Sequence, residues 1–125
     1  MRRGVSDEGQ AAVELALVLP LVLAALLAIV QVALLARDQV LVIQAAREAA
    51  REAAVNPDVR AAQEAAVASS SLATDRLEVT LGERGAPGSQ VSATVRYRCP
   101  TDVPLVGVVL GEIVLEAKAT MRVER

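Results

Sequence analysis

One uncharged apolar stretch, Leu15–Ala36, constrains this chain more than any other feature. It reads LALVLPLVLAALLAIVQVALLA, with Gln31 as its only polar side chain and Pro20 as its only helix breaker. About 20 apolar residues suffice to cross the hydrocarbon core of a bilayer as a helix. A helix on the surface of a soluble protein would present a polar face, and this stretch has none. The sequence therefore predicts a transmembrane helix with Leu15, Pro20, Gln31 and Ala36 among its residues.

Two other interpretations of this stretch, a buried core helix and a cleaved secretory signal, fit the sequence less well. The remaining residues are too few to wrap a soluble core helix of this length that is apolar on all sides. A cleaved secretory signal usually has a shorter apolar region, about 7–15 residues, followed by a small-x-small cleavage site, for which this stretch is poorly suited. We therefore expect an uncleaved anchor.

Composition excludes several classes of function. The 125 residues leave room for one span and one small domain, and the net charge of −2 argues against a nucleic-acid surface. The chain has no His, Trp or Phe, so imidazole catalysis and a zinc site are excluded, and the soluble core must be thin. Cys99 is the single cysteine, more plausible as a small core residue than as an intersubunit bridge or a lipidation site. We expect no enzyme, no cofactor, no metal and no small-molecule substrate.

The residues before the span form a short tail that carries charges of both signs. Arg2 and Arg3 favour a cytoplasmic N-terminus, although arginines also follow the span. Glu14 borders the apolar run directly, where a carboxylate is costly. It is either an interfacial acid stabilised by the N-terminal end of a helix, or a partner for a positive group on another subunit.

After the span, Arg37–Ala54 continues the same helix and is rich in alanine, the best helix former. Its predicted apolar stripe consists of Val40, Ile43, Ala46 and Ala50. Arg47 and Arg51 lie in the repeated AARE segments. They form either a solvated helix face or a lateral contact with other subunits.

A second helix is expected at Pro57–Ser70. Asn56 is a suitable N-cap with Pro57 at the first helical position. The residues expected on its buried side are Val59, Ala62, Ala66 and Val67.

The last third alternates apolar and polar residues with the period of strands. The expected strands are Leu77–Leu81, Gln90–Arg98 and Ile113–Val123, with a turn-rich loop at Gly82–Gly88. An antiparallel meander with the helices on its apolar face is the simplest topology. The segment Pro100–Gly111 fits a short strand, a helical turn in the core or a loop dipping into the membrane interface; we favour a compact apolar loop or single helical turn that closes the core.

Together these elements predict a membrane-anchored α+β chain with a long N-terminal transmembrane helix that extends outward, a short second helix and a small three-stranded antiparallel sheet. We expect three parts: a leader or cytoplasmic tail at 1–9, the transmembrane helix and its extension at 10–55, and a small extracytoplasmic domain at 56–125.

From Gly9 onward the chain resembles the TadE-like family, minor pilin-like (pseudopilin) proteins of Tad/Flp pilus assembly and secretion systems. The resemblance lies in the residues GQAAVE (9–14), which run into LALVLP (15–20), and in AREAAR (46–51), which is similar to the family's AREGAR stretch. It covers residues from Gly9 to about Ala54, whereas the C-terminal half resembles the family only in its pattern of strands.

The resemblance to prepilins implies processing between Gly9 and Gln10, which places Glu14 at the fifth mature position. The new amine on Gln10 would then pair with Glu14 of an adjacent subunit. Gln10 departs from the aromatic first residue of many pilins, and Asp7 and Glu8 dilute the basic leader.

The resemblance further implies a pilin-like fold and a single-pass protein of the cytoplasmic membrane, with its N-terminus inside and its C-terminal domain outside. The implied partners are other pilin or pseudopilin subunits, the inner-membrane assembly platform and a prepilin peptidase. The predicted function is a minor structural subunit of a Tad/Flp-type system. The alternative is a signal-anchored cell-surface protein that never enters a pilus.

Overall fold

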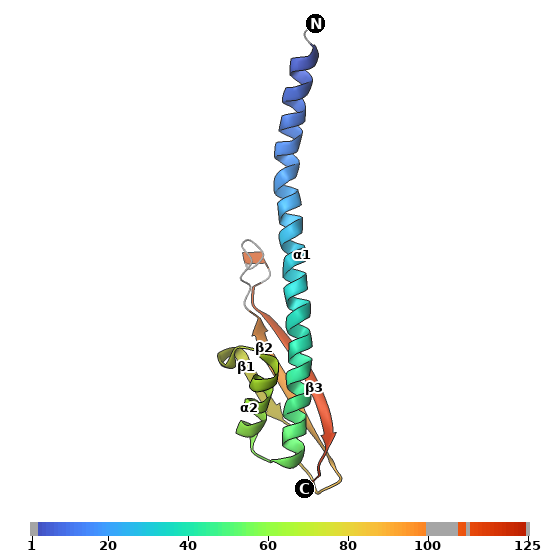
Figure 1. Ribbon diagram of the computed structural model, residues 1–125, viewed down its shortest axis with the longest axis vertical. Coiled ribbons are helices and arrows are strands. Elements are labelled where there is room, and N and C mark those ends of the chain that lie inside the picture. Colours follow the sequence, from blue (N-terminus) through green and yellow to red (C-terminus); the bar gives the residue numbers. More distant parts are fainter. Residues whose placement is uncertain (1–2, 100–107, 110, 125) are drawn as a thin grey trace.

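A computed structural model of the chain describes residues 3–99, 108–109 and 111–124. One helix, α1 (Arg3–Val55), makes up the length of the molecule, and its C-terminal half carries a small α+β domain (Figure 1). A helix of this length extends about 80 Å at 1.5 Å per residue. The α+β class and the order of elements agree with the sequence prediction.

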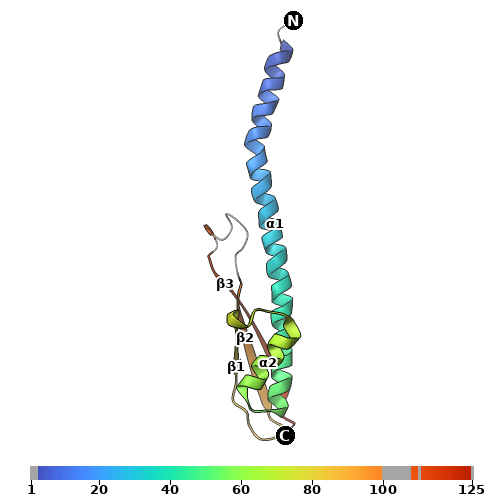
Figure 2. The same cartoon turned by 60° about the vertical axis from the view of Figure 1, so that its left-hand side comes forward.

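The domain has two layers. Strands β1 (Leu77–Leu81), β2 (Gln90–Cys99) and β3 (Ile113–Arg122) form an antiparallel sheet in the order β1-β2-β3. Helix α1 and the short helix α2 (Val59–Ser70) pack together and cover one face of this sheet (Figures 1 and 2). The predicted meander is confirmed.

The sheet follows its sequence pattern closely. Strand β2 alternates buried Val91, Ala93, Val95 and Tyr97 with polar residues on the open face. Val95 lies opposite Val79 of β1 and Ala117 of β3. The inner residues of β3 are mostly half-buried, because β3 is an edge strand with a neighbour on one side only.

The face of α1 that enters the core differs from the predicted stripe. Ala46 and Ala50 are buried as expected, but Val40 and Ile43 are exposed. The buried stripe consists of Val42, Ala45, Ala46, Ala49, Ala50, Ala53 and Ala54. Alanine at most of these positions lets the helix approach the sheet and α2 closely.

The start of α2 also corrects the prediction. The N-cap is Asp58, whose carboxylate accepts a hydrogen bond from the Arg60 N–H at 3.0 Å. Asn56 instead forms a turn, in which its side-chain oxygen accepts from the Asp58 N–H at 3.0 Å. Helix α2 therefore begins at Val59, which is exposed rather than buried. The helix ends at Ser70, with Ser71 in the left-handed conformation.

Most of the segment Pro100–Gly111 lies outside the described residues. Three of its residues are described: Gly111 lies outside any helix or strand, and Val108 and Val109 are helical. Both are exposed, so these two do not take part in the core.

Candidate assembly surface along helix α1

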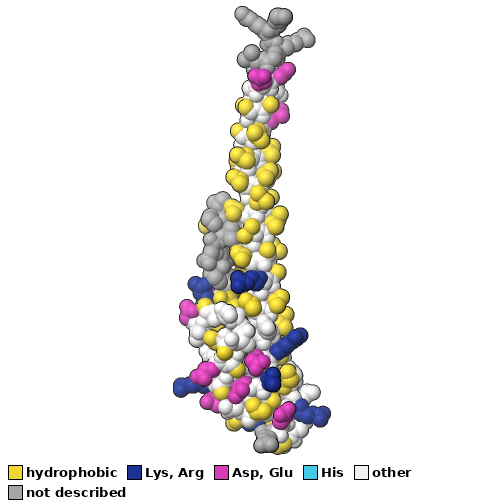
Figure 3. All heavy atoms as spheres, in the orientation of Figure 1, with side chains coloured by type: hydrophobic (Ala, Val, Ile, Leu, Met, Phe, Trp, Pro, Cys, Tyr) yellow, Lys and Arg dark blue, Asp and Glu magenta, His cyan; other side chains and the backbone are white. Residues whose placement is uncertain are grey.

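The N-terminal half of α1 is an apolar rod without a polar face over residues 15–30. Within the described part of the chain, one helix is long and apolar enough to cross a membrane, and its most apolar window is fully exposed. Yellow hydrophobic side chains cover this half of the rod in Figure 3, whereas charged side chains gather on the domain and near the N-terminus. Leu15, Pro20 and Ala36 all lie on the exposed surface.

Gly9, Gln10 and Glu14 lie in the first turns of α1, and all three are exposed. A Cβ atom added at Gly9 would meet no atom within 4 Å. Glycine inside a helix destabilises it by roughly 0.5–1 kcal/mol relative to alanine. The fold of this chain therefore gives no reason for a glycine at this position. Gln10 and Glu14 are one helical turn apart, on the same side of α1.

Gln31 differs from its neighbours in the apolar segment. It is only 3% exposed, whereas Val30 and Val32 on either side are exposed. Its side-chain oxygen accepts no hydrogen bond from any residue that the structure describes. The amide is thus turned away from the lipid-facing surface of α1, as expected of a polar group in a transmembrane helix.

Arg47 and Arg51 lie on the side of α1 that points away from the core, and both are exposed. Arg47 lines a hollow of about 360 Å³ with Val40, Ile43 and Gln44. The residues around Arg51 line a second hollow of about 520 Å³: Glu48, Glu52, Ala54, Val55, Met121, Arg122 and Glu124. We call Val40, Ile43, Arg47 and Arg51 the outer face of α1. It combines apolar and positively charged side chains that the fold does not cover.

Sequence reasoning missed a contact between α1 and the end of β2. The Cys99 thiol is buried beside Asp38, which lies two residues after the apolar segment. Burial, and after it the negative charge and hydrogen-bonding capacity of Asp38, raise the pKa of the thiol from 9.0 to about 11. This contact lies between the end of β2 and α1. Because its pKa is raised, Cys99 remains a neutral thiol near pH 7.

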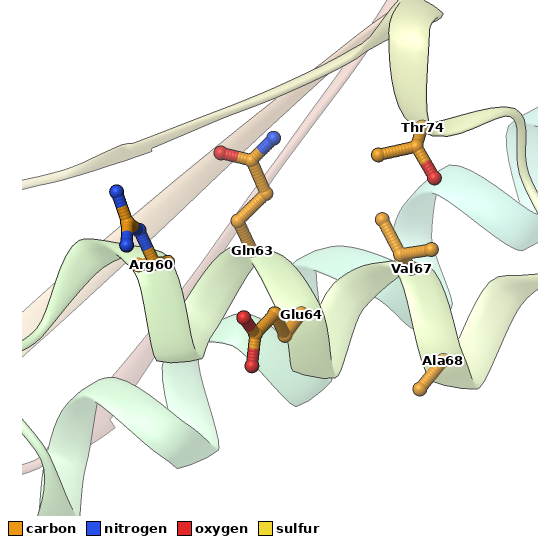
Figure 4. A pocket seen from close by; sticks show the side chains of 6 residues that line it. All are labelled: Arg60, Gln63, Glu64, Val67, Ala68 and Thr74. Atoms are coloured by element: carbon orange, nitrogen blue, oxygen red, sulfur yellow. The ribbon is translucent and has the colours of Figure 1, made fainter.

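A third hollow, of about 480 Å³, lies on α2 beside the short 3-10 helix η1 (Thr74–Arg76). Figure 4 shows Val67 of α2 near Thr74 at one end and Arg60 at the other. Gln63, Glu64 and Ala68 complete the lining. This mixture of short apolar and charged side chains suits contact with a protein surface. Among the residues that the structure describes, no three His, Cys, Asp or Glu side chains are placed to hold a metal ion.

Comparison with known proteins agrees with the resemblance seen in the sequence. Residues 9–51 match the family model described as TadE-like protein. The match begins at Gly9, includes the whole apolar segment and ends at Arg51. The comparisons with curated proteins and with solved structures gave no significant match.

Proposed function

We propose that this chain, a TadE-like protein by the match over its residues 9–51, is a membrane-anchored structural subunit of a Tad/Flp-type pilus or secretion assembly. The observation that carries the proposal is the coincidence of the match with α1. The matched residues include both the exposed apolar rod and its outer face, which the fold itself leaves uncovered.

In this proposal α1 crosses the cytoplasmic membrane once, with the N-terminus inside and the α+β domain outside. A helix satisfies its own backbone hydrogen bonds in lipid, so a single span is a complete solution. Arg2 and Arg3 supply positive charge on the inner side. The domain then lies where the outer face of α1 meets the soluble parts of neighbouring subunits.

We further propose that a prepilin peptidase removes residues 1–9. An exposed Gly9 with free space around it suits recognition by another protein, because the fold does not require glycine there. Cleavage would give Gln10 a positively charged amine close to the membrane. Glu14 of an adjacent subunit would pair with that amine, since an unpaired charge in lipid is costly.

The outer face of α1 is the proposed lateral contact with the major pilin, a sister pseudopilin or the assembly platform. Arg47 and Arg51 would form ion pairs at its rim, and Val40 and Ile43 would supply the apolar centre, in the usual arrangement of a protein interface. We propose a role in assembly rather than in catalysis. The remaining candidate is a single-pass surface protein that stays outside any pilus.

Site-specific photo-crosslinking in the native membrane tests the proposal. A photoreactive amino acid replaces Arg51 on the outer face of α1 or, as a control, Lys118 on the open face of the sheet. Both positions are exposed. We expect crosslinks to pilin-like or platform proteins from position 51, and their loss in a Glu14→Ala background. Crosslinks that are the same from both positions, or absent from both, would favour the surface protein that stays outside a pilus.

A further inference from the structure

The most exposed large apolar side chains in the domain are those of two adjacent valines. Val108 is 89% exposed and Val109 is 82% exposed, more than any of the exposed apolar residues of α1. In Figures 1 and 2 their short orange helical piece lies beside α1, beyond the sheet and towards the N-terminus. Both views place it level with the light-blue part of α1, which belongs to the apolar segment. These two side chains are therefore at the height of the proposed membrane.

The core of the domain extends along α1 into the same region. Leu35 packs against the main core cluster although it belongs to the apolar segment. Leu27 is half-buried and Gln31 is buried on the same side of the helix, at intervals of four residues. One side of α1 is thus covered by the protein within Leu15–Ala36, and the other sides remain apolar and exposed.

Several charged residues that the structure describes lie at the domain-side edge of this region. Arg98 near the end of β2 and Glu112 just before β3 form an exposed ion pair with a distance of 3.8 Å. Between Cys99 and Glu112 the sequence contains one charged residue, Asp102, and includes the apolar run LVGVVL (105–110). On α1 the corresponding boundary is Arg37. Arg37, Arg98 and Glu112 are thus exposed charged residues at this end of the domain.

We propose that Val108 and Val109 are immersed in the outer leaflet of the membrane that α1 spans. The domain would then meet the bilayer at α1 and, in addition, at Val108 and Val109. The occupant is lipid, because the two valines lie at the height of the exposed apolar surface of α1. Insertion of an apolar segment into a membrane interface is favourable in proportion to the apolar area that leaves water. The proposal rests on insertion of α1, which is part of the proposed function.

Spin labels in the full-length chain, reconstituted in lipid nanodiscs, test this proposal. Cys99→Ser removes the native thiol but keeps a small neutral side chain beside Asp38. A nitroxide is then attached to a cysteine at position 108 or 109. Leu23 in the apolar segment serves as the lipid reference, and Ala86 in the exposed loop between β1 and β2 serves as the water reference. The measurement is the accessibility of each label to oxygen, which concentrates in lipid, and to a water-soluble nickel chelate.

We expect labels at 108 and 109 to behave like the label at 23, with a ratio of oxygen to nickel accessibility several-fold above that at 86. A ratio equal to that at 86 would overturn the proposal by placing the valines in water. Exclusion of both reagents would overturn it in favour of a protein contact. If the label at 23 also behaves like the one at 86, α1 is not inserted and the proposed anchor fails as well, so the two failures are distinguishable.

Two substitutions at position 108 test the same proposal with the label kept at position 109. Val108→Asp should move a label at 109 into water, because a carboxylate is costly in the hydrocarbon. Val108→Leu should leave that label in lipid. An unchanged accessibility ratio at 109 in the Val108→Asp variant would contradict lipid immersion of this segment.

Discussion

The stability of the domain should depend on single buried methyl groups, because its core is built from alanine and valine rather than aromatic residues. Val95 is fully buried at the centre of β2, between Val79 and Ala117 on the neighbouring strands. Val95→Ala removes two methyl groups, each worth about 0.8 kcal/mol, and leaves a small cavity. We therefore expect the free energy of unfolding to fall by about 2 kcal/mol, which is roughly a 30-fold change in the unfolding equilibrium.

The matched control is Val114→Ala. Val114 also lies in a strand, but its side chain is exposed on the open face of the sheet. Both substitutions lower β propensity in the same way, so the difference between them isolates burial. We expect a change within about 0.5 kcal/mol at position 114, as is usual for surface positions.

The rate at which a maleimide labels Cys99 measures this loss of stability. Cys99 is the single cysteine and is buried at the end of β2, so a maleimide reacts with it only when the sheet opens. The labelling rate of the full-length chain in nanodiscs then follows the population of the open form. At equal pH, the loss of about 2 kcal/mol should make labelling of the Val95→Ala chain roughly 30-fold faster than labelling of the wild type. Equal rates for the Val95→Ala and Val114→Ala chains would refute the reasoning.

Three further predictions concern the thiol and the ends of α2. Because the raised pKa of Cys99 favours the neutral thiol in the folded chain, its contribution to stability is complete below pH 9 and is lost as the pH rises towards about 11; the urea midpoint should fall over this range more in the wild type than in Cys99→Ser. Asp58→Ala removes the N-cap of α2 and should lower the unfolding free energy by about 1 kcal/mol, whereas Val59→Ala should change it little; a urea titration of both variants decides. Ser71→Gly should raise the urea midpoint, by about 0.4–1 kcal/mol in stability, because Ser71 has a φ of 58°; an unchanged or lower midpoint would contradict this.

The sheet could be predicted because its strands alternate strictly. The pattern of Val91, Val95 and Tyr97 against polar neighbours determines which face is buried, since side chains on a strand point to opposite sides in turn. The long apolar helix could be predicted equally well, because few structures other than a membrane-spanning helix accommodate an uncharged apolar segment of this length. Both signals are local, so they need no knowledge of distant contacts.

The face of α1 that packs into the domain could not be predicted in the same way. Val40, Leu41, Val42 and Ile43 are consecutive and point to all sides of the helix, whereas the alanines between positions 45 and 54 lie on one side only. Tertiary packing then selects the side on which alanine allows the closest approach, which turns Val42 inward and Val40 and Ile43 outward. The sequence pattern therefore placed Val40 and Ile43 in the core, whereas they belong to the outer face of α1.

The contact between Asp38 and Cys99 depends on residues far apart in the sequence, so no spacing pattern indicates it. The N-cap of α2 was misplaced by two residues because Asn56 and Asp58 are both good capping residues. The candidate contact residues Arg47 and Arg51 were identifiable from their repeated spacing. That they lie on an uncovered side became clear only from the structure.

The mass and N-terminal sequence of the protein recovered from native membranes test the central claim most directly. The claim is that α1 stays attached to the domain as an anchor after removal of the leader. We predict a membrane-bound chain that begins at Gln10. A chain that begins at Met1 would remove the processing step and with it the new amine for Glu14. A chain that begins within or beyond Leu15–Ala36 would contradict the claim, because the apolar segment would then be a cleaved secretory signal.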